Sequence, residues 1–115
     1  MQISKDLVAA SATPLILSIL EKEDNYGYSI IKKVKELSGD KIEWTEGMLY
    51  PVLHRLETQK AIESYWKESE TGRKRKYYKI NKKGNDLLEE HKEQWNTVNE
   101  ALQKSWDINL KFSYS

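Results

Sequence analysis

Apolar residues recur at helical spacing in two segments near the start of the chain. Residues 5–23 are apolar around most of a helix circumference, which predicts a buried helix. Pro14 lies inside this segment, so either a helix begins at Pro14 after a cap at Thr13, or one longer helix passes through the proline. A second, amphipathic helix is expected to start after a cap at Asn25 and to end at residues 38–39, where glycine tolerates a left-handed turn.

A third helix is predicted after a short linker. Thr45 occupies the place of an N-cap, and four apolar residues follow at the i, i+3, i+4 and i+7 spacing of a helix face: Leu49, Val52, Leu53 and Leu56. Pro51 interrupts this segment, and a proline in a helix interior removes one backbone hydrogen bond. The four apolar residues are assigned to the core, so the opposite face of this helix should point outward.

The hydrophobic pattern changes to that of strands after the third helix. Residues 63–68 and 75–80 are rich in Tyr, Trp and Ile, and the loop between them contains Gly72, so the two segments predict a β-hairpin. Three helices followed by a two-stranded hairpin is the element order of a winged helix-turn-helix. In that arrangement the third helix enters the DNA major groove, and the hairpin, called the wing, lies beside it. We therefore expect a mainly α fold with a small β-hairpin.

The last part of the chain shows a heptad pattern from Lys82 onward. Its seam consists of four apolar or aromatic residues and one histidine: Leu88, His91, Trp95, Val98 and Leu102. A heptad seam needs a partner helix. The same helix of a second copy is the simplest partner, because the earlier elements already form a compact unit. The pattern therefore predicts a homodimer.

The chain is thus expected to have three parts. Residues 1–81 should form the winged helix-turn-helix domain, whose N-terminal helix also contributes to the dimer. Residues 82–106 should form a C-terminal dimerisation helix. In residues 107–115 apolar and polar residues alternate, which suits a strand or a segment lying along another subunit. A loose C-terminal tail is the alternative.

Positive charge is concentrated around the predicted hairpin. Seven of the 19 Lys and Arg residues lie within residues 71–84, which contain no Asp or Glu. The rest of the chain has twelve basic and eighteen acidic residues, so its net charge is −6 although the whole chain carries +1. A wing must be positive because phosphate contacts dominate affinity for DNA. A solvated hairpin whose lysines discourage edge-to-edge aggregation is the alternative explanation.

Composition argues against several other functions. The chain has no Cys and no Gly-rich phosphate loop, and its two histidines, His54 and His91, belong to different elements. Neither a catalytic site, a metal site nor a cofactor site is expected, so the protein should not be an enzyme. The 32% of charged residues and the short apolar runs argue against a membrane span, and no secretory signal is expected. The lack of Cys agrees with a cytoplasmic location.

Four stretches of the sequence together resemble the PadR family of bacterial transcriptional regulators. They read NYGYSIIKKV at residues 25–34, EGMLYPVLHRLE at 46–57, AIESYW at 61–66 and RKYYKINKKG at 75–84. The resemblance implies a dimeric repressor whose third helix reads an inverted repeat in double-stranded DNA, with the wing tip as a second contact. The DNA-contacting residues that it implies are Thr45, Glu46, Gly47, Tyr50, His54, Arg73, Lys74 and Arg75.

Some residues of the third helix have structural alternatives. Tyr50 could pack within its own domain, and Arg55 could form a salt bridge with an acidic neighbour as readily as it could contact a phosphate. Gly47 is informative in physical terms, because a missing side chain lets the helix approach the DNA backbone closely.

The last helix resembles that of the short-tailed PadR branch, which includes multidrug-responsive repressors. In those relatives a tryptophan of the last helix is paired across the dimer and stacks on flat aromatic drugs, and Trp95 matches it in order and heptad position. The resemblance implies a planar aromatic effector that contacts Trp95, Pro14 and Asn99. The relatives place carboxylates where this chain has Asn99 and Gln103, which argues against a preference for cationic drugs. A purely structural role for Trp95 in the dimer core is the equal alternative.

A winged helix can also bind another protein instead of DNA. Salt separates the two functions, because binding to a duplex through about six to eight phosphates weakens steeply as salt rises. A mainly apolar protein interface should not show this dependence.

Overall fold

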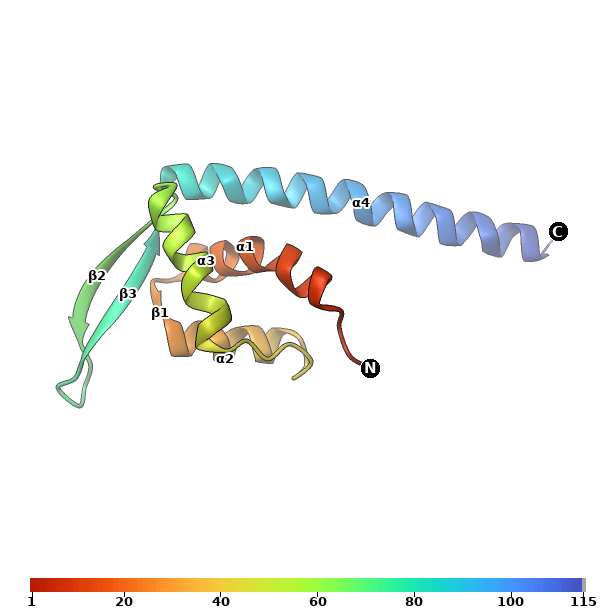
Figure 1. The fold of residues 1–115 in the computed structure, drawn as a ribbon. Coiled ribbons are helices and arrows are strands. Elements are labelled where there is room, and N and C mark those ends of the chain that lie inside the picture. Colours follow the sequence, from red (N-terminus) through yellow and green to blue (C-terminus); the bar gives the residue numbers. More distant parts are fainter. Residues whose placement is uncertain (115) are drawn as a thin grey trace.

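The computed structural model describes the backbone of residues 1–114 and the side chains of residues 1–107. In chain order, its elements are α1 (Lys5–Lys22), β1 (Asn25–Tyr26), α2 (Gly27–Leu37), α3 (Glu46–Thr58), β2 (Ile62–Glu68), β3 (Lys74–Ile80) and α4 (Lys82–Tyr114). Helices α1 to α3 and the sheet form one body, and α4 extends away from it (Figure 1), which gives the molecule extents of 66 × 30 × 21 Å. The fold is therefore a mainly α winged helix-turn-helix, as predicted.

The hydrophobic core lies between the first three helices and the inner face of the sheet. Its most deeply buried side chains come from these helices, from the hairpin and from the start of α4: Ile16, Leu17, Leu20, Ile30, Val34, Leu49, Leu53, Leu56, Ile62, Tyr78 and Leu88. Val52, the fourth core residue predicted for the third helix, is half-buried against this cluster. The helical spacing in the sequence thus predicted the core face of α3 correctly. No helix in the described part of the chain is both long and apolar enough to cross a bilayer.

Helix α1 is one continuous helix that passes through Pro14, which decides between the two alternatives left by the sequence. Ser4 caps its N-terminus, since Ser4 Oγ accepts a hydrogen bond of 3.3 Å from the Leu7 backbone N–H. Pro14 has no N–H to donate to the preceding turn, so the helix lacks one hydrogen bond there. Burial of Ile16 and Leu17 in the next turn provides tertiary packing that stabilises the helix across this gap.

The prediction that Asn25 caps the second helix is wrong. Asn25 and Tyr26 form the short strand β1, and α2 starts at Gly27 without a capping side chain. Strand β1 pairs antiparallel with β3, where Asn25 lies opposite Tyr78. The Asn25 side chain accepts a hydrogen bond of 3.1 Å from the adjacent Tyr26 N–H instead of capping a helix. Pairing with a strand some fifty residues away therefore overrides the local capping preference.

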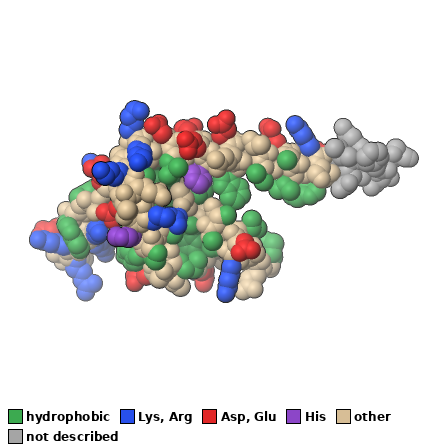
Figure 2. Space-filling view, turned by 45° about the horizontal axis from the view of Figure 1, so that its top comes forward, with side chains coloured by type: hydrophobic (Ala, Val, Ile, Leu, Met, Phe, Trp, Pro, Cys, Tyr) green, Lys and Arg blue, Asp and Glu red, His purple; other side chains and the backbone are tan. Residues whose placement is uncertain are grey.

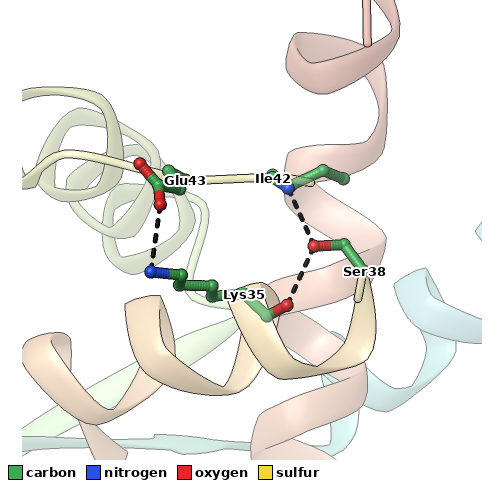
Figure 3. Close-up of polar contacts among 4 residues, drawn as sticks. All are labelled: Lys35, Ser38, Ile42 and Glu43. Carbon is green, nitrogen blue, oxygen red and sulfur yellow. Dashed lines mark hydrogen bonds and ion pairs between the residues drawn. The ribbon is translucent and has the colours of Figure 1, made fainter. Parts of the chain in front are cut away.

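The turn between α2 and α3 is held by side chains at the end of α2 (Figure 3). Ser38 Oγ donates to the Lys35 carbonyl oxygen at 3.0 Å and accepts from the Ile42 backbone N–H at 2.8 Å. Lys35 Nζ lies 3.0 Å from a Glu43 carboxylate oxygen, and this hydrogen bond raises the pKa of Lys35. Gly39 adopts a φ of 61° and ends α2 where the sequence predicted. These contacts set the direction in which the chain leaves α2 for α3.

Helix α3 begins as predicted with Thr45 as its N-cap. Thr45 Oγ1 accepts a hydrogen bond of 3.3 Å from the Met48 backbone N–H. The helix continues through Pro51, whose ring is exposed, so packing of the opposite face outweighs the hydrogen bond that proline removes. Arg55 Nη2 donates to Thr13 Oγ1 at 3.1 Å, which ties α3 to α1 in place of the acidic partner considered from the sequence.

The wing is formed by β2 and β3, which pair antiparallel from Ile62 opposite Ile80 to Glu68 opposite Lys74. Each strand starts one residue earlier than predicted. Strand β1 lies on the other side of β3, so the sheet has three strands in the order β1-β3-β2. At the tip, the Ser69 N–H donates to the Arg73 carbonyl oxygen at 2.7 Å and closes the loop.

Helix α4 begins at Lys82, as predicted, but it extends beyond the predicted end at residue 106. Asn81 caps its start, since Asn81 Oδ1 accepts from the Gly84 N–H at 2.9 Å. The helix continues to Tyr114, so the alternation that suggested a strand or tail at 107–115 belongs to a helix as far as that residue. When apolar residues alternate with polar ones, apolar residues also recur four positions apart. That spacing places them on one face of a helix, so the pattern is compatible with a helix. Ser115 lies outside the described residues.

Candidate nucleic-acid interface

The outward face of α3 lies open beside the wing. Tyr50 and His54, one helical turn apart, are both exposed, and Tyr50 keeps 43% of its surface accessible. The Tyr50 hydroxyl lies against Gly27 in the first turn of α2. The contact is so close that a Cβ added at Gly27 would lie 2.5 Å from the hydroxyl oxygen. Tyr50 therefore packs within its own domain and still presents part of its surface to a ligand.

The first turn of α3 presents Thr45, Glu46 and Gly47, all of which are exposed. The Thr45 hydroxyl caps the helix. Among the described residues, the Glu46 carboxylate forms no hydrogen bond or ion pair with another side chain. A Cβ added at Gly47 would meet only Thr45 Oγ1 at 3.7 Å, which is an ordinary contact. No packing within the described protomer therefore requires glycine at this position, and its backbone is open to close approach from outside.

The basic residues of the wing lie at one end of the molecule. Arg73 and Lys74 are exposed at the tip. Arg75 is half-buried, and its guanidinium carbon lies 4.5 Å from the centroid of the Tyr26 ring, in a cation–π contact that orients it. Figure 2 shows Lys and Arg side chains around the wing, and a mixture of acidic and basic side chains along α4. Most of the basic stretch at residues 71–84 therefore lies on the wing.

Side-chain contacts tie both faces of the wing to the rest of the domain. Tyr65 Oη donates to Asp24 Oδ2 at 2.6 Å, and this hydrogen bond raises the pKa of Tyr65 to about 12. On the opposite face, Glu57 of α3 accepts a hydrogen bond of 2.9 Å from Ser64 Oγ. Glu57 also pairs with Lys76 Nζ at 3.7 Å. The wing and α3 are therefore held in a defined relative position.

Three further residues, Tyr28, Trp66 and Lys76, lie between α2, α3 and the wing. Lys76 belongs to the basic stretch expected to meet phosphate, whereas the sequence did not predict Tyr28 and Trp66 for the site. Tyr28 and Trp66 are 66% and 67% exposed, and Lys76 lies directly opposite Trp66 in the hairpin. Tyr28 and Trp66 belong to the sequence stretches that resemble the family, but only the fold brings them near each other. Large aromatic side chains left this exposed are a signal of a binding surface.

A hollow of about 300 Å³ lies between α1 and α4. Pro14 of α1 and Trp95 of α4 both line it, so the fold brings these two predicted ligand-contacting residues together. Asn99, one turn beyond Trp95, is exposed and lies outside the lining. The hollow is open to solvent on the side that α1 and α4 do not cover.

Lys92 is the charged residue that lines this hollow, and two carboxylates surround it. Its Nζ lies 3.3 Å from Glu89 Oε1 and 3.7 Å from Glu21 Oε1. The hydrogen bond to Glu89 is the main reason that the pKa of Lys92 is raised. The positive charge is therefore compensated within the protomer.

From Trp95 onward, α4 exposes a stripe of apolar side chains. Four of them keep 38, 53, 45 and 52% of their surface accessible: Trp95, Val98, Leu102 and Trp106. Trp106 was not part of the predicted seam and extends the stripe by one turn. His91 is half-buried at the near end of the stripe. Leu88, which was predicted for the seam, is instead fully buried in its own protomer because the start of α4 packs on α1, so we exclude it from the exposed stripe.

These features define a winged helix-turn-helix protein whose third helix and basic wing face the same end of the molecule. Residues 16–90 match the "Transcriptional regulator PadR-like family", and the chain belongs to this family of DNA-binding transcriptional regulators. Members of the family act as transcriptional regulators and not as enzymes. Within the described residues, no group of three or more His, Asp or Glu side chains could hold a metal ion.

Two relatives show how much of the chain this similarity covers. The "Uncharacterized protein X" of Lysinibacillus sphaericus is 31% identical over 100 residues, which are 87% of this chain and 92% of the relative. The transcriptional regulator YqjI of Escherichia coli is 32% identical over 89 residues. That match spans 77% of this chain but only 41% of YqjI.

Solved structures share the fold over most of their length. A transcriptional regulator from Clostridium thermocellum superposes with a TM-score of 0.80 at 31% identity, over 89% of this chain and 96% of that one. A PadR family regulator from Clostridium difficile superposes with a TM-score of 0.73 at 38% identity, over 82% of this chain and 96% of that one. A PadR-like regulator from Bacillus cereus superposes with a TM-score of 0.77 at 34% identity, over 87% of this chain and 95% of that one.

Proposed function

We propose that the protein is a homodimeric repressor that binds an inverted-repeat operator through α3 and the wing tip of each subunit. The observation that supports this most directly is the exposed face of α3, with Tyr50 and His54, beside a wing that concentrates the positive charge. In this function α3 enters the major groove and presents Glu46, Gly47 and His54 to the base edges. The protein would act in the cytoplasm, where its operator lies.

The wing tip would supply phosphate contacts. Arg73 and Lys74 are exposed, and Arg75 is held over the Tyr26 ring with its guanidinium available for a phosphate. Phosphate contacts position a protein on a duplex but do not read its sequence. The net charge of −6 outside residues 71–84 disfavours contact of other surfaces with DNA.

Replacing Arg73, Lys74 and Arg75 together with Ala should weaken binding to the DNA upstream of the protein's own gene and to random DNA alike. The slope of log affinity against log salt should become shallower by about 0.9 for each phosphate that the variant no longer neutralises. The measurement is fluorescence anisotropy across a salt series. A matched variant replaces three exposed lysines outside the basic stretch and the interface, Lys5, Lys22 and Lys104, and should bind nearly as tightly as the wild type.

Unchanged DNA affinity in the wing-tip variant would refute the assignment of the wing. Binding that is insensitive to salt in the wild type would favour a protein-interaction module instead of a DNA-binding one.

The proposed dimer joins the exposed stripes of two α4 helices, with α1 contributing at its edge. The interface residues would be Trp95, Val98 and Leu102 together with His91 and Trp106. Two facts support this: the stripe is apolar and exposed, and it lies on the part of α4 that extends beyond the body of the protomer. A second copy gives the simplest symmetric partner, because a two-fold axis places identical stripes face to face.

A planar aromatic effector would bind in the hollow between α1 and α4 and release the DNA. Its support is that Pro14 and Trp95 line one hollow, with Asn99 one turn away at its rim. The accessible lining of the hollow is mainly apolar, which suits a flat aromatic ligand.

Planar aromatic compounds should quench the tryptophan fluorescence of the wild type, and Trp95→Ala should abolish this quenching. The matched variant Trp106→Ala removes another exposed tryptophan of α4 and should retain it. Quenching and ligand affinity that persist in Trp95→Ala would show that Trp95 is purely structural.

A further inference from the structure

A second hollow, of about 350 Å³, lies where the start of α2, the face of α3 and the wing meet. Its lining includes Tyr28 of α2, Tyr50 of α3, Trp66 of β2, and Arg75 and Lys76 of β3. Tyr26 and Gly27 complete the lining, so four aromatic residues and two basic residues surround one small space. Lys76 also holds the wing to α3 through its ion pair with Glu57.

The strand register shows which way this part of the wing faces. Trp66 and Lys76 are directly opposite each other, so they lie on the same face of the sheet. Two and four residues further along β3, Tyr78 and Ile80 lie on that same face and pack in or against the core. Trp66 and Lys76 thus continue the helix-facing side of the sheet beyond the core, towards α3. The ion pair from Lys76 Nζ to Glu57 of α3 at 3.7 Å agrees with this direction.

The walls of the hollow are held in place by interactions within the protomer. The Tyr50 hydroxyl packs on Gly27, where an added Cβ would come within 2.5 Å of the hydroxyl oxygen, so the Tyr50 side chain would have to shift to admit it. The Arg75 guanidinium is held 4.5 Å above the Tyr26 ring. The Tyr28 and Trp66 rings, in contrast, have two thirds of their surface accessible and contribute to the lining without being buried. The hollow is therefore preformed on one side and open on the other.

The position of the hollow determines what a bound duplex would place there. A winged helix-turn-helix inserts α3 into the major groove and lays its wing towards the adjacent minor groove. The element of DNA that separates two adjacent grooves is one sugar–phosphate backbone. A hollow between α3 and the wing therefore faces that backbone and not the base edges.

We propose that this hollow binds one sugar–phosphate unit of the DNA backbone at the boundary between the two grooves. Lys76 would contact the phosphodiester oxygens, and the rings of Tyr28 and Trp66 would pack against the apolar face of the deoxyribose. The site would set the depth at which α3 enters the groove without reading sequence itself. This inference rests on the proposed function, since it adds a contact to the same DNA complex.

The test uses the full-length protein and a fluorescein-labelled duplex of mixed sequence, with anisotropy measured across a salt series. Lys76→Gln should make the log–log salt slope shallower by about 0.9, the value for one phosphate that is no longer neutralised. The matched control is Lys79→Gln, which removes the same charge from an exposed residue three positions further along β3, on the opposite face of the sheet. Its slope should equal that of the wild type.

Trp66 tests the sugar contact separately. Trp66→Ala should weaken binding several-fold while leaving the salt slope unchanged, because it removes an apolar contact and no charge. Trp66→Phe should restore most of the affinity, since it keeps a flat apolar ring. Far-UV circular dichroism and the melting temperature should match the wild type in each variant, because Trp66 is exposed.

Two different failures are distinguishable. If the wild type binds the duplex, the wing-tip variant weakens binding, and both Lys76→Gln and Trp66→Ala behave like the wild type, the hollow is not a DNA contact and the proposed function stands. A wild type that does not bind duplex DNA in a salt-dependent way would overturn the proposed function and this inference together.

Discussion

The two halves of α4 bury their apolar residues in different ways. In the first half, Leu88 is fully buried between α4 and the body of its own protomer. Further along the helix, Trp95, Val98 and Leu102 lie on the same seam of the heptad pattern but keep 38 to 53% of their surface exposed. One helix therefore serves as part of the core at its start and as an unpaired apolar surface further along.

The difference shows that a heptad pattern reports apolar spacing and not the identity of the partner. The first turns of α4 pack on α1 and β3, which belong to the same chain. The later turns run beyond that body, so the same spacing finds no partner in the protomer (Figure 1). Burying a large apolar side chain contributes about 1.5–3 kcal/mol. The exposed half of α4 thus favours association, whereas the buried half stabilises the fold.

The largest expected effect comes from Leu88→Ala. Removal of a fully buried leucine should lower the free energy of unfolding of the protomer by about 2–5 kcal/mol, through reduced burial and the cavity left behind. Urea unfolding at several protein concentrations measures this decrease, which should be similar at each concentration. A decrease of less than about 1 kcal/mol would mean that Leu88 is not a core residue of the protomer.

The same type of substitution further along α4, Leu102→Ala, should weaken dimer association instead of folding. Leu102 is 45% exposed in the protomer, so its truncation should hardly change the folding of the winged domain. We expect it to weaken the dimer by about 2 kcal/mol, because each subunit then buries one partly covered leucine side chain less. Analytical ultracentrifugation over a concentration series measures the dimer constant. Equal dimer constants for Leu102→Ala and the wild type would contradict the proposed interface.

The smallest expected effect comes from Thr45→Ala in the winged domain, which should change folding stability but not dimer association. Thr45→Ala removes the side-chain cap of α3, which should cost about 1 kcal/mol in unfolding free energy. Chemical unfolding measures this change, and sedimentation should show an unaltered dimer constant. Thr45→Ser keeps the hydroxyl and serves as the control, with a stability close to that of the wild type.

Local patterns in the sequence were enough to predict most of the fold. The spacing of Leu49, Leu53 and Leu56 identified the core face of α3, and Thr45 and Gly39 marked a helix start and a helix end correctly. The hairpin was predicted to within one residue at the start of each strand. These features depend on residues close together in the chain, so they can be read without the fold.

The features that were missed depend on residues far apart in the chain. Strand β1 exists because Asn25 pairs with Tyr78, and no periodicity near Asn25 indicates that pairing. The burial of Leu88 depends on how α1 lies against α4. The hollow lined by Tyr28 and Trp66 likewise needs three elements to meet. Sequence reasoning therefore identified the wing-tip cations and the α3 face, but it could not locate the space between them.

The bare backbone at Gly47 has a consequence for how DNA preference could change. An added methyl group at this position would touch only Thr45 Oγ1 at an ordinary distance, so Gly47→Ala should leave folding intact or slightly improve it. Few exposed positions combine such freedom within the protein with a location on the first turn of α3. New side chains could therefore be explored here, by evolution or by an engineer, with little risk of unfolding the protein that displays them.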